Sequence, residues 1–126
     1  MELNKEMEVL VVDDQQMMRR IVISLLKQLG IIRVREASDG RTALAQLEEG
    51  PVDLILSDWN MEGMSGLEFL KAVRADDKYK HLPFIMVTGE NKVTNIVAAK
   101  EAGVSNYMVK PFSAATLKTK ILSVLK

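Results

Sequence analysis

Apolar residues gather along the chain in five short runs. The runs span residues 8–12, 31–37, 52–57, 83–88 and 105–109. The first, third and fourth are almost continuously apolar, which is typical of central parallel strands covered by helices on both faces. We therefore predict five strands of a buried sheet.

Each apolar run is followed by a segment in which apolar residues recur every three or four positions. These segments span residues 16–29, 41–49, 66–75, 92–102 and 114–125. In the first, Val22, Leu26 and Leu29 follow this spacing, and Gly30 is a suitable residue for ending a helix. The pattern predicts five amphipathic helices.

Strict alternation of strand and helix predicts an α/β domain with a parallel sheet and helices on both of its faces. Right-handed crossovers leave few topologies, and the flavodoxin-like (βα)5 order 2-1-3-4-5 suits five units, although the number of elements does not dictate it. A length of 126 residues is enough for one domain with a proper core, so we assign residues 1–126 to one domain.

Polar residues stand where four of the five predicted strands end. Asp13 and Asp14 follow the first strand, Asp58 the third, Thr88 the fourth and Lys110 the fifth. In the order 2-1-3-4-5 these four strands are contiguous, and sites in such sheets form beyond the carboxyl ends of the strands. The second strand ends instead in Ser38-Asp39-Gly40, which predicts a turn and a helix N-cap.

Taken singly, each of these residues has an ordinary structural role. An Asp before a helix is commonly a cap, a Thr is a common strand residue, and a Lys is usually a solvated surface charge. Capping requires only one Asp, however, and explains neither the adjacent pair Asp13-Asp14 nor the third acid at a neighbouring strand end. Together the residues favour a functional site.

The residue types at these strand ends favour a hard cation. The chain has no Cys and a single His, His81 in the expected loop before the fourth strand, and three converging carboxylates repel one another unless a cation neutralises them. Mg²⁺ suits carboxylates together with a phosphate, and Lys110 and Thr88 suit phosphoryl oxygens. The set predicts apparatus that forms an aspartyl phosphate on Asp58.

Charge and hydropathy narrow the class of protein. Lys and Arg together number 17, as do Asp and Glu, so no basic field predicts binding to nucleic acid or to anionic lipid. No apolar run approaches membrane-spanning length, and the first residues lack the apolar core of a signal peptide. We expect a cytoplasmic protein.

Four segments resemble response-regulator receiver domains of two-component systems, and among them the stand-alone regulators of chemotaxis. The segments are VVDD, SDWNM, LPFIMVTGE and NYMVKPFSAATL. The resemblance implies that Asp58 accepts phosphate from a histidine kinase and that Thr88 and Lys110 bind the phosphoryl group. It also implies that Asp13, Asp14, Asp58 and the backbone carbonyl of Asn60 hold Mg²⁺, and that the Lys110–Pro111 bond is cis.

The same resemblance implies roles in switching and output. Tyr107 would be an aromatic switch coupled to Thr88, and Asn60 and Glu90 would tune autodephosphorylation. The face built from residues 92–102, 105–109 and 114–125 would bind the flagellar motor switch, and a phosphatase could act on the phosphorylated form. The resemblance implies a monomeric signalling protein that catalyses only its own phosphotransfer and autodephosphorylation.

The sequence departs from the family at Glu62, where Pro is usual, and at Ser65, where Asp is usual, so we expect a more mobile acceptor loop. A phosphatase of the haloacid dehalogenase type would need a D-x-D motif on the first strand, and an FMN carrier would need a Ser/Thr/Gly-rich loop there; Asp13-Asp14-Gln15 fits neither. The complete acidic, Thr and Lys set disfavours an unphosphorylated interaction domain. A receiver in another phosphorelay remains the alternative.

Overall fold

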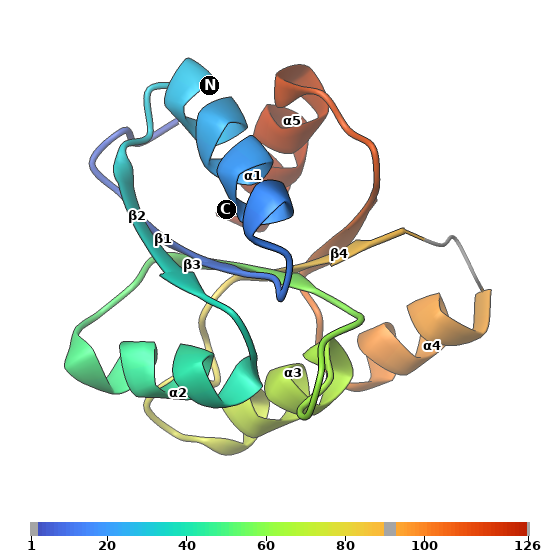
Figure 1. The fold of residues 1–126 in the computed structure, drawn as a ribbon. Helices are drawn as coiled ribbons and strands as arrows, with labels where there is room; N and C mark the ends of the chain where they lie inside the picture. Colours follow the sequence, from blue (N-terminus) through green and yellow to red (C-terminus); the bar gives the residue numbers. More distant parts are fainter. Residues whose placement is uncertain (1–2, 90–92, 126) are drawn as a thin grey trace.

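The five apolar runs form one parallel sheet in the computed structural model, which describes residues 3–89 and 93–125 (Figure 1). The strands are β1 (Glu8–Val12), β2 (Arg33–Ala37), β3 (Leu54–Asp58), β4 (Phe84–Thr88) and β5 (Asn106–Val109). Their order is β2-β1-β3-β4-β5, and every neighbouring pair is parallel. The predicted flavodoxin-like fold is confirmed.

Five helices cover the sheet in two layers. They are α1 (Gln16–Gln28), α2 (Gly40–Glu49), α3 (Gly66–Ala75), α4 (Val93–Glu101) and α5 (Ala114–Val124). Figure 1 shows α1 and α5 on one face and α2, α3 and α4 on the other. Within the part of the chain that the structure describes, no helix has the length and apolar character needed to cross a membrane.

The core consists of two apolar clusters, one on each face of the sheet. Successive strand residues point to opposite faces, so Val9 and Val11 pack toward α1 and α5 whereas Leu10 and Val12 pack toward α2 and α3. The central strands β3 and β4 are buried along their whole length. This explains why their sequences are almost continuously apolar.

Two strands, β2 and β3, begin two residues later than their apolar runs. The β2 run starts at Ile31, but the Ile31 N–H donates to the Leu26 carbonyl oxygen at 2.9 Å, and Gly30 has a φ of +88°. Ile31 therefore completes the C-terminal turn of α1, and pairing with β1 starts at Arg33. β3 starts at Leu54 and extends to Asp58, so the acid is the last residue of the strand.

Candidate functional site

The three acids predicted from the strand ends lie together. Asp13 and Asp14 follow β1, and Asp58 ends β3, the strand that pairs with β1. One carboxylate oxygen from each lies within 4.8 Å of the others. Asp13 and Asp58 are buried and Asp14 is exposed. The cluster is therefore accessible to solvent at Asp14.

Lys110, directly after β5, reaches two of these acids. Its Nζ lies 2.9 Å from Oδ1 of Asp58 and 3.3 Å from Oδ2 of Asp13. The side chains are only 19% exposed for Lys110, 9% for Asp58 and 6% for Asp13. These ion pairs are therefore less screened by solvent and salt than pairs between exposed side chains.

Burial and neighbouring charges shift the pKa of both members of the Asp58–Lys110 pair. Burial raises the pKa of the Asp58 carboxyl, and the Asp13 and Asp14 charges act in the same direction, against the hydrogen bond and charge of Lys110. Burial lowers the pKa of the Lys110 ammonium, but its hydrogen bond with Asp58 and the charges of Asp58 and Asp13 outweigh this, so the pKa is raised. The cluster thus holds three carboxylates, and Lys110 pairs with two of them, which favours a further cation.

The backbone of Asp13 is fixed on several sides. Its N–H donates to the Ala37 carbonyl oxygen at 3.1 Å, and its Oδ1 accepts the Gln15 N–H at 2.9 Å. The N-cap of α1 is Gln15, which makes no side-chain cap bond. Neither Asp13 nor Asp14 is therefore the helix cap, whereas Asp39 caps α2 as predicted.

The donor set fits Mg²⁺. All three clustered side chains offer carboxylate oxygens, which this hard cation prefers. Asp14 also lines an open cavity of about 370 Å³, whose other lining residues are Trp59, Asn60, Met61, Glu62 and Ser65. Mg²⁺ usually keeps several waters, and an open side of this kind accommodates them. Asn60 lies beside Asp14 at this cavity.

Thr88 and Tyr107 line a second cavity, which Trp59 also lines. Thr88 is buried at the end of β4, and Tyr107 is half-buried on β5, where it pairs with Met86. The cavity holds about 10 Å³, the space of one water, and is lined by Trp59, Met86, Thr88, Asn95, Ile96, Ala99 and Tyr107. The two residues of the predicted switch are thus adjacent, whereas Glu90 lies outside the described residues.

The loop after Asp58 packs closely on its surroundings. The Gly66 N–H donates to the Trp59 carbonyl oxygen at 2.8 Å, and a Cβ at position 66 would collide with the backbone oxygen of Asp58. Ser65 accepts the Glu68 N–H at 3.2 Å and forms a capping box for α3. Ser65 is therefore the N-cap of α3. The Asp that is usual at this position in the family is also a good N-cap residue.

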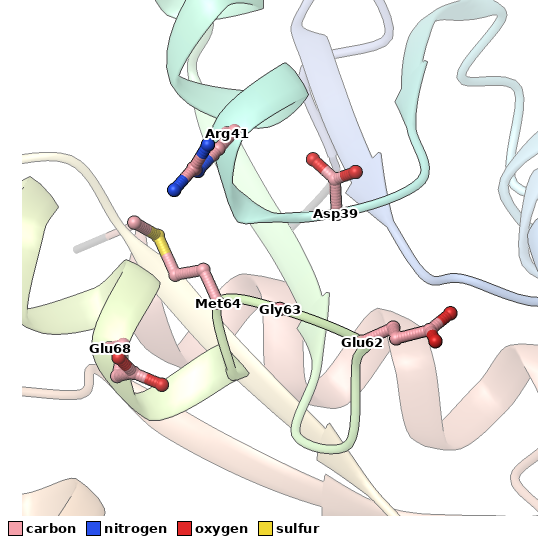
Figure 2. Close-up of a pocket in the computed structure, with 6 residues that line it drawn as sticks. All are labelled: Asp39, Arg41, Glu62, Gly63, Met64 and Glu68. Carbon is pink, nitrogen blue, oxygen red and sulfur yellow. The ribbon is translucent and has the colours of Figure 1, made fainter.

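Figure 2 shows the other side of this loop, where Met64 points toward the first turn of α2 and Arg41. A Cβ at Gly40 would lie 2.5 Å from the Met64 sulfur, so the glycine permits this contact. A cavity of about 460 Å³ lies there, lined by Asp39, Arg41, Glu62, Gly63, Met64 and Glu68. Glu62 is exposed and lines both this cavity and the one at Asp14.

Sequence reasoning missed Arg19. Its guanidinium contacts the backbone of Asp13 and the side chain of Glu36 on β2. Nothing in the local sequence distinguishes it from its neighbour Arg20, because both are basic residues of one helix. The Lys110–Pro111 bond is cis, as the resemblance implies.

Comparison with known proteins agrees with this geometry. Residues 9–122 match the family described as the response regulator receiver domain. The chain is 53% identical over 119 residues to the chemotaxis protein CheY-3 of Vibrio cholerae serotype O1, covering 94% of this chain and 92% of the relative. It is 50% identical over 120 residues to the chemotaxis protein CheY of Pseudomonas aeruginosa, covering 95% and 97%.

Solved structures of chemotaxis proteins and response regulators have the same fold. The chemotaxis protein CheY4 of Vibrio cholerae superposes with a TM-score of 0.89 at 39% identity, covering 95% of this chain and 99% of that one. A putative response regulator from Chloroflexus aurantiacus superposes with a TM-score of 0.90 at 30% identity, covering 96% and 98%.

Proposed function

Because this chain belongs to the response regulator receiver domain family, we propose that it is a stand-alone regulator activated by phosphorylation of Asp58. The observation that carries the proposal is the 2.9 Å contact between Asp58 Oδ1 and Lys110 Nζ inside a cluster of three carboxylates. A structural role for Asp58 would require only the lysine. The two further acids favour a site that takes up a cation and a phosphoryl group.

The proposed reaction transfers a phosphoryl group from a histidine kinase. A carboxylate oxygen of Asp58 attacks phosphorus in line, an O–P bond forms, and the P–N bond to the kinase imidazole breaks. The imidazole leaves with the electron pair of that bond and takes up a proton. Mg²⁺ held by Asp13, Asp14, Asp58 and the Asn60 carbonyl would supply positive charge to the phosphoryl oxygens.

The residues of the chain then have distinct tasks. Lys110 provides a fixed positive charge for a phosphoryl oxygen, because its ammonium is already held at the acceptor carboxylate. Thr88 is buried at the neighbouring strand end and provides a hydroxyl donor. Asn60, exposed beside the site, together with Glu90 would control access of the water that later hydrolyses the acyl phosphate.

Output would pass through Thr88 and Tyr107. A Thr88 drawn toward the phosphoryl group changes the cavity that it shares with the Tyr107 ring, and this biases a two-state equilibrium of Tyr107. The affected surface is the face of α4, β5 and α5. The names of the relatives support chemotaxis as the process and the flagellar motor switch as the partner of a cytoplasmic, monomeric regulator.

The experiment uses the wild type and Asp58→Asn with acetyl phosphate and Mg²⁺. We expect acid-labile phosphate on the wild type alone, seen by intact-protein mass spectrometry, because Asn cannot form an acyl phosphate. Only the phosphorylated wild type should then bind the flagellar motor switch protein. Phosphate on Asp58→Asn would refute the assignment of the acceptor. Phosphorylation without motor binding would favour the alternative, a receiver in another phosphorelay.

A further inference from the structure

Arg19 on the first turns of α1 connects three parts of the site region. Its NH1 donates to the Asp13 carbonyl oxygen at 2.7 Å, and its Nε donates to Oε1 of Glu36 on β2 at 3.0 Å. The Arg19 side chain is 15% exposed, against 47% for Glu36. The guanidinium is therefore held between the loop after β1 and the edge strand.

The Asp13 carbonyl needs such a partner. Asp13 lies one residue beyond β1 and is buried, so its carbonyl oxygen is past the end of the strand that pairs with β2 and β3. A buried carbonyl without a partner costs free energy. Arg19 supplies the bond, while Ala37 accepts the Asp13 N–H on the other side. The backbone of Asp13 is thereby held at its N–H by Ala37 and at its carbonyl, which belongs to the Asp13–Asp14 peptide, by Arg19.

We infer that Arg19 is a positioning residue for Mg²⁺ binding: by fixing the peptide between Asp13 and Asp14 it sets where their two carboxylates lie. This inference rests on the Mg²⁺ site proposed above. Removing a group that orients metal ligands from behind typically costs 10–100-fold in metal affinity. The planar guanidinium suits the task because two of its N–H groups point at two fixed acceptors.

The positive charge of Arg19, taken alone, predicts the opposite effect of its removal on the affinity for Mg²⁺. A guanidinium that contacts the backbone of one of the acids repels an incoming cation, so removing its charge should by itself tighten Mg²⁺ binding. Positioning predicts weaker binding after the same substitution. The direction of the change therefore separates the two roles.

The experiment is a Mg²⁺ titration followed by Trp59 fluorescence and, separately, by thermal unfolding. Trp59 adjoins Asp58 and is the sole Trp. We expect Arg19→Met, which keeps much of the apolar stem, to raise the Kd for Mg²⁺ about tenfold or more. The matched control is Arg20→Met, which changes the net charge equally. Arg20 is exposed and forms no ion pair with any residue among 3–89 and 93–125, so its Kd should stay near that of the wild type.

Circular dichroism and unfolding without Mg²⁺ establish that each variant is folded. If Arg19→Met does not fold, Arg19→Lys is measured instead. It keeps the charge but not the planar fork, and we expect its Kd for Mg²⁺ to exceed that of the wild type.

A Kd for the folded Arg19 variant equal to or below that of the wild type would overturn the inference. A wild type without any response to Mg²⁺ would instead refute the metal site and the proposed function.

Discussion

Asp58 and Lys110 form the shorter of the two ion pairs that Lys110 makes with the acids, at 2.9 Å, and both side chains are largely buried. Removing one partner of such a pair leaves an uncompensated buried charge, which typically costs about 3–5 kcal/mol. Lys110 also faces Asp13. The lysine therefore stabilises the metal-free site as well as supplying the charge proposed for the phosphoryl group.

Adding a single methyl group at Gly66 should lower the stability of the fold. In Gly66→Ala the new methyl group meets the backbone oxygen of Asp58, and this oxygen belongs to a buried strand that cannot yield cheaply. We expect the free energy of unfolding to fall by about 1–3 kcal/mol, measured by urea denaturation.

Gly89→Ala is the control for Gly66→Ala. No described atom lies within 4 Å of a Cβ at position 89, so Ala there is expected to leave stability unchanged or to raise it by about 0.4–1 kcal/mol. Equal stability of the two variants would show that the loop after Asp58 can move away without cost.

Individual site residues can be predicted from the sequence where a charged residue directly follows an apolar strand. Three acids and a lysine at strand ends stand out against an apolar background, and they do converge. Arg19 and Arg20 do not differ in this way. Which of them faces the Asp13 carbonyl depends on the rotation of α1 against the sheet, which residue types alone do not determine.

Among the elements, the helix starts depend on local side-chain bonds. Asp39 and Thr42 form a capping box at α2, and Ser65 and Glu68 form one at α3. Ser113 accepts the Thr116 N–H at the start of α5. α1 has no such side-chain bond at Gln15. Asp13 and Asp14, which precede α1, are thus not its N-cap and belong to the acidic cluster instead.

The cap of α2 gives a pH-dependent prediction. The backbone bond from Thr42 and then its hydroxyl lower the pKa of Asp39. Since this pKa is lower in the folded state, the stabilisation is present above the unfolded value of about 3.9 and is lost as pH falls through the folded pKa. We expect Asp39→Ala to lower the free energy of unfolding by about 1 kcal/mol at neutral pH and by less in acid.

Urea denaturation at neutral and acidic pH measures this difference. Asp39→Asn is the control, because Asn caps helices about as well as Asp and does not titrate. A loss in Asp39→Ala that is the same at both pH values would show that the carboxylate charge does not contribute to the cap.

Element boundaries were less predictable than element types. Periodicity identified every strand and helix in order, but the β2 run included Ile31, which belongs to the turn that ends α1. An apolar residue looks the same whether it is buried by a sheet partner or by a helix end. Only the backbone bond of Ile31 to Leu26 distinguishes the two.

For the whole molecule, the sheet order is what brings the acids and the lysine together. β1 and β3 are neighbours, and β5 lies two strands from β3, so the Lys110 side chain reaches across the carboxyl edge of the sheet. The repulsion among three carboxylates opposes folding when no cation is bound. We therefore expect folding to be coupled to the proposed binding of Mg²⁺.

This coupling predicts a shift in thermal stability. Mg²⁺ at about one hundred times its Kd should stabilise the wild type by about 2.7 kcal/mol and raise Tm. Asp14→Ala should abolish the rise while leaving the metal-free fold intact, because Asp14 is exposed. Differential scanning calorimetry at constant ionic strength measures both effects.

Asp77→Ala is the matched control for Asp14→Ala. Asp77 is an exposed acid outside the cluster, paired with Lys80, so its variant should keep the full response to Mg²⁺. A wild-type Tm that does not change with Mg²⁺ would refute the metal site.

The ion pair between Asp13 and Lys110 joins residues 97 positions apart, and this has a consequence for synthesis on the ribosome. A nascent chain that has exposed β1, β3 and β4 already carries the acceptor Asp58, but β5 and the lysine that follows it are still to come. Until then the carboxylate lacks its counter-charge and the proposed phosphoryl group lacks a ligand. On the proposed function, we therefore expect the chain to accept phosphate only after Lys110 has left the ribosome and joined the acids, so that unfinished chains would not compete for it.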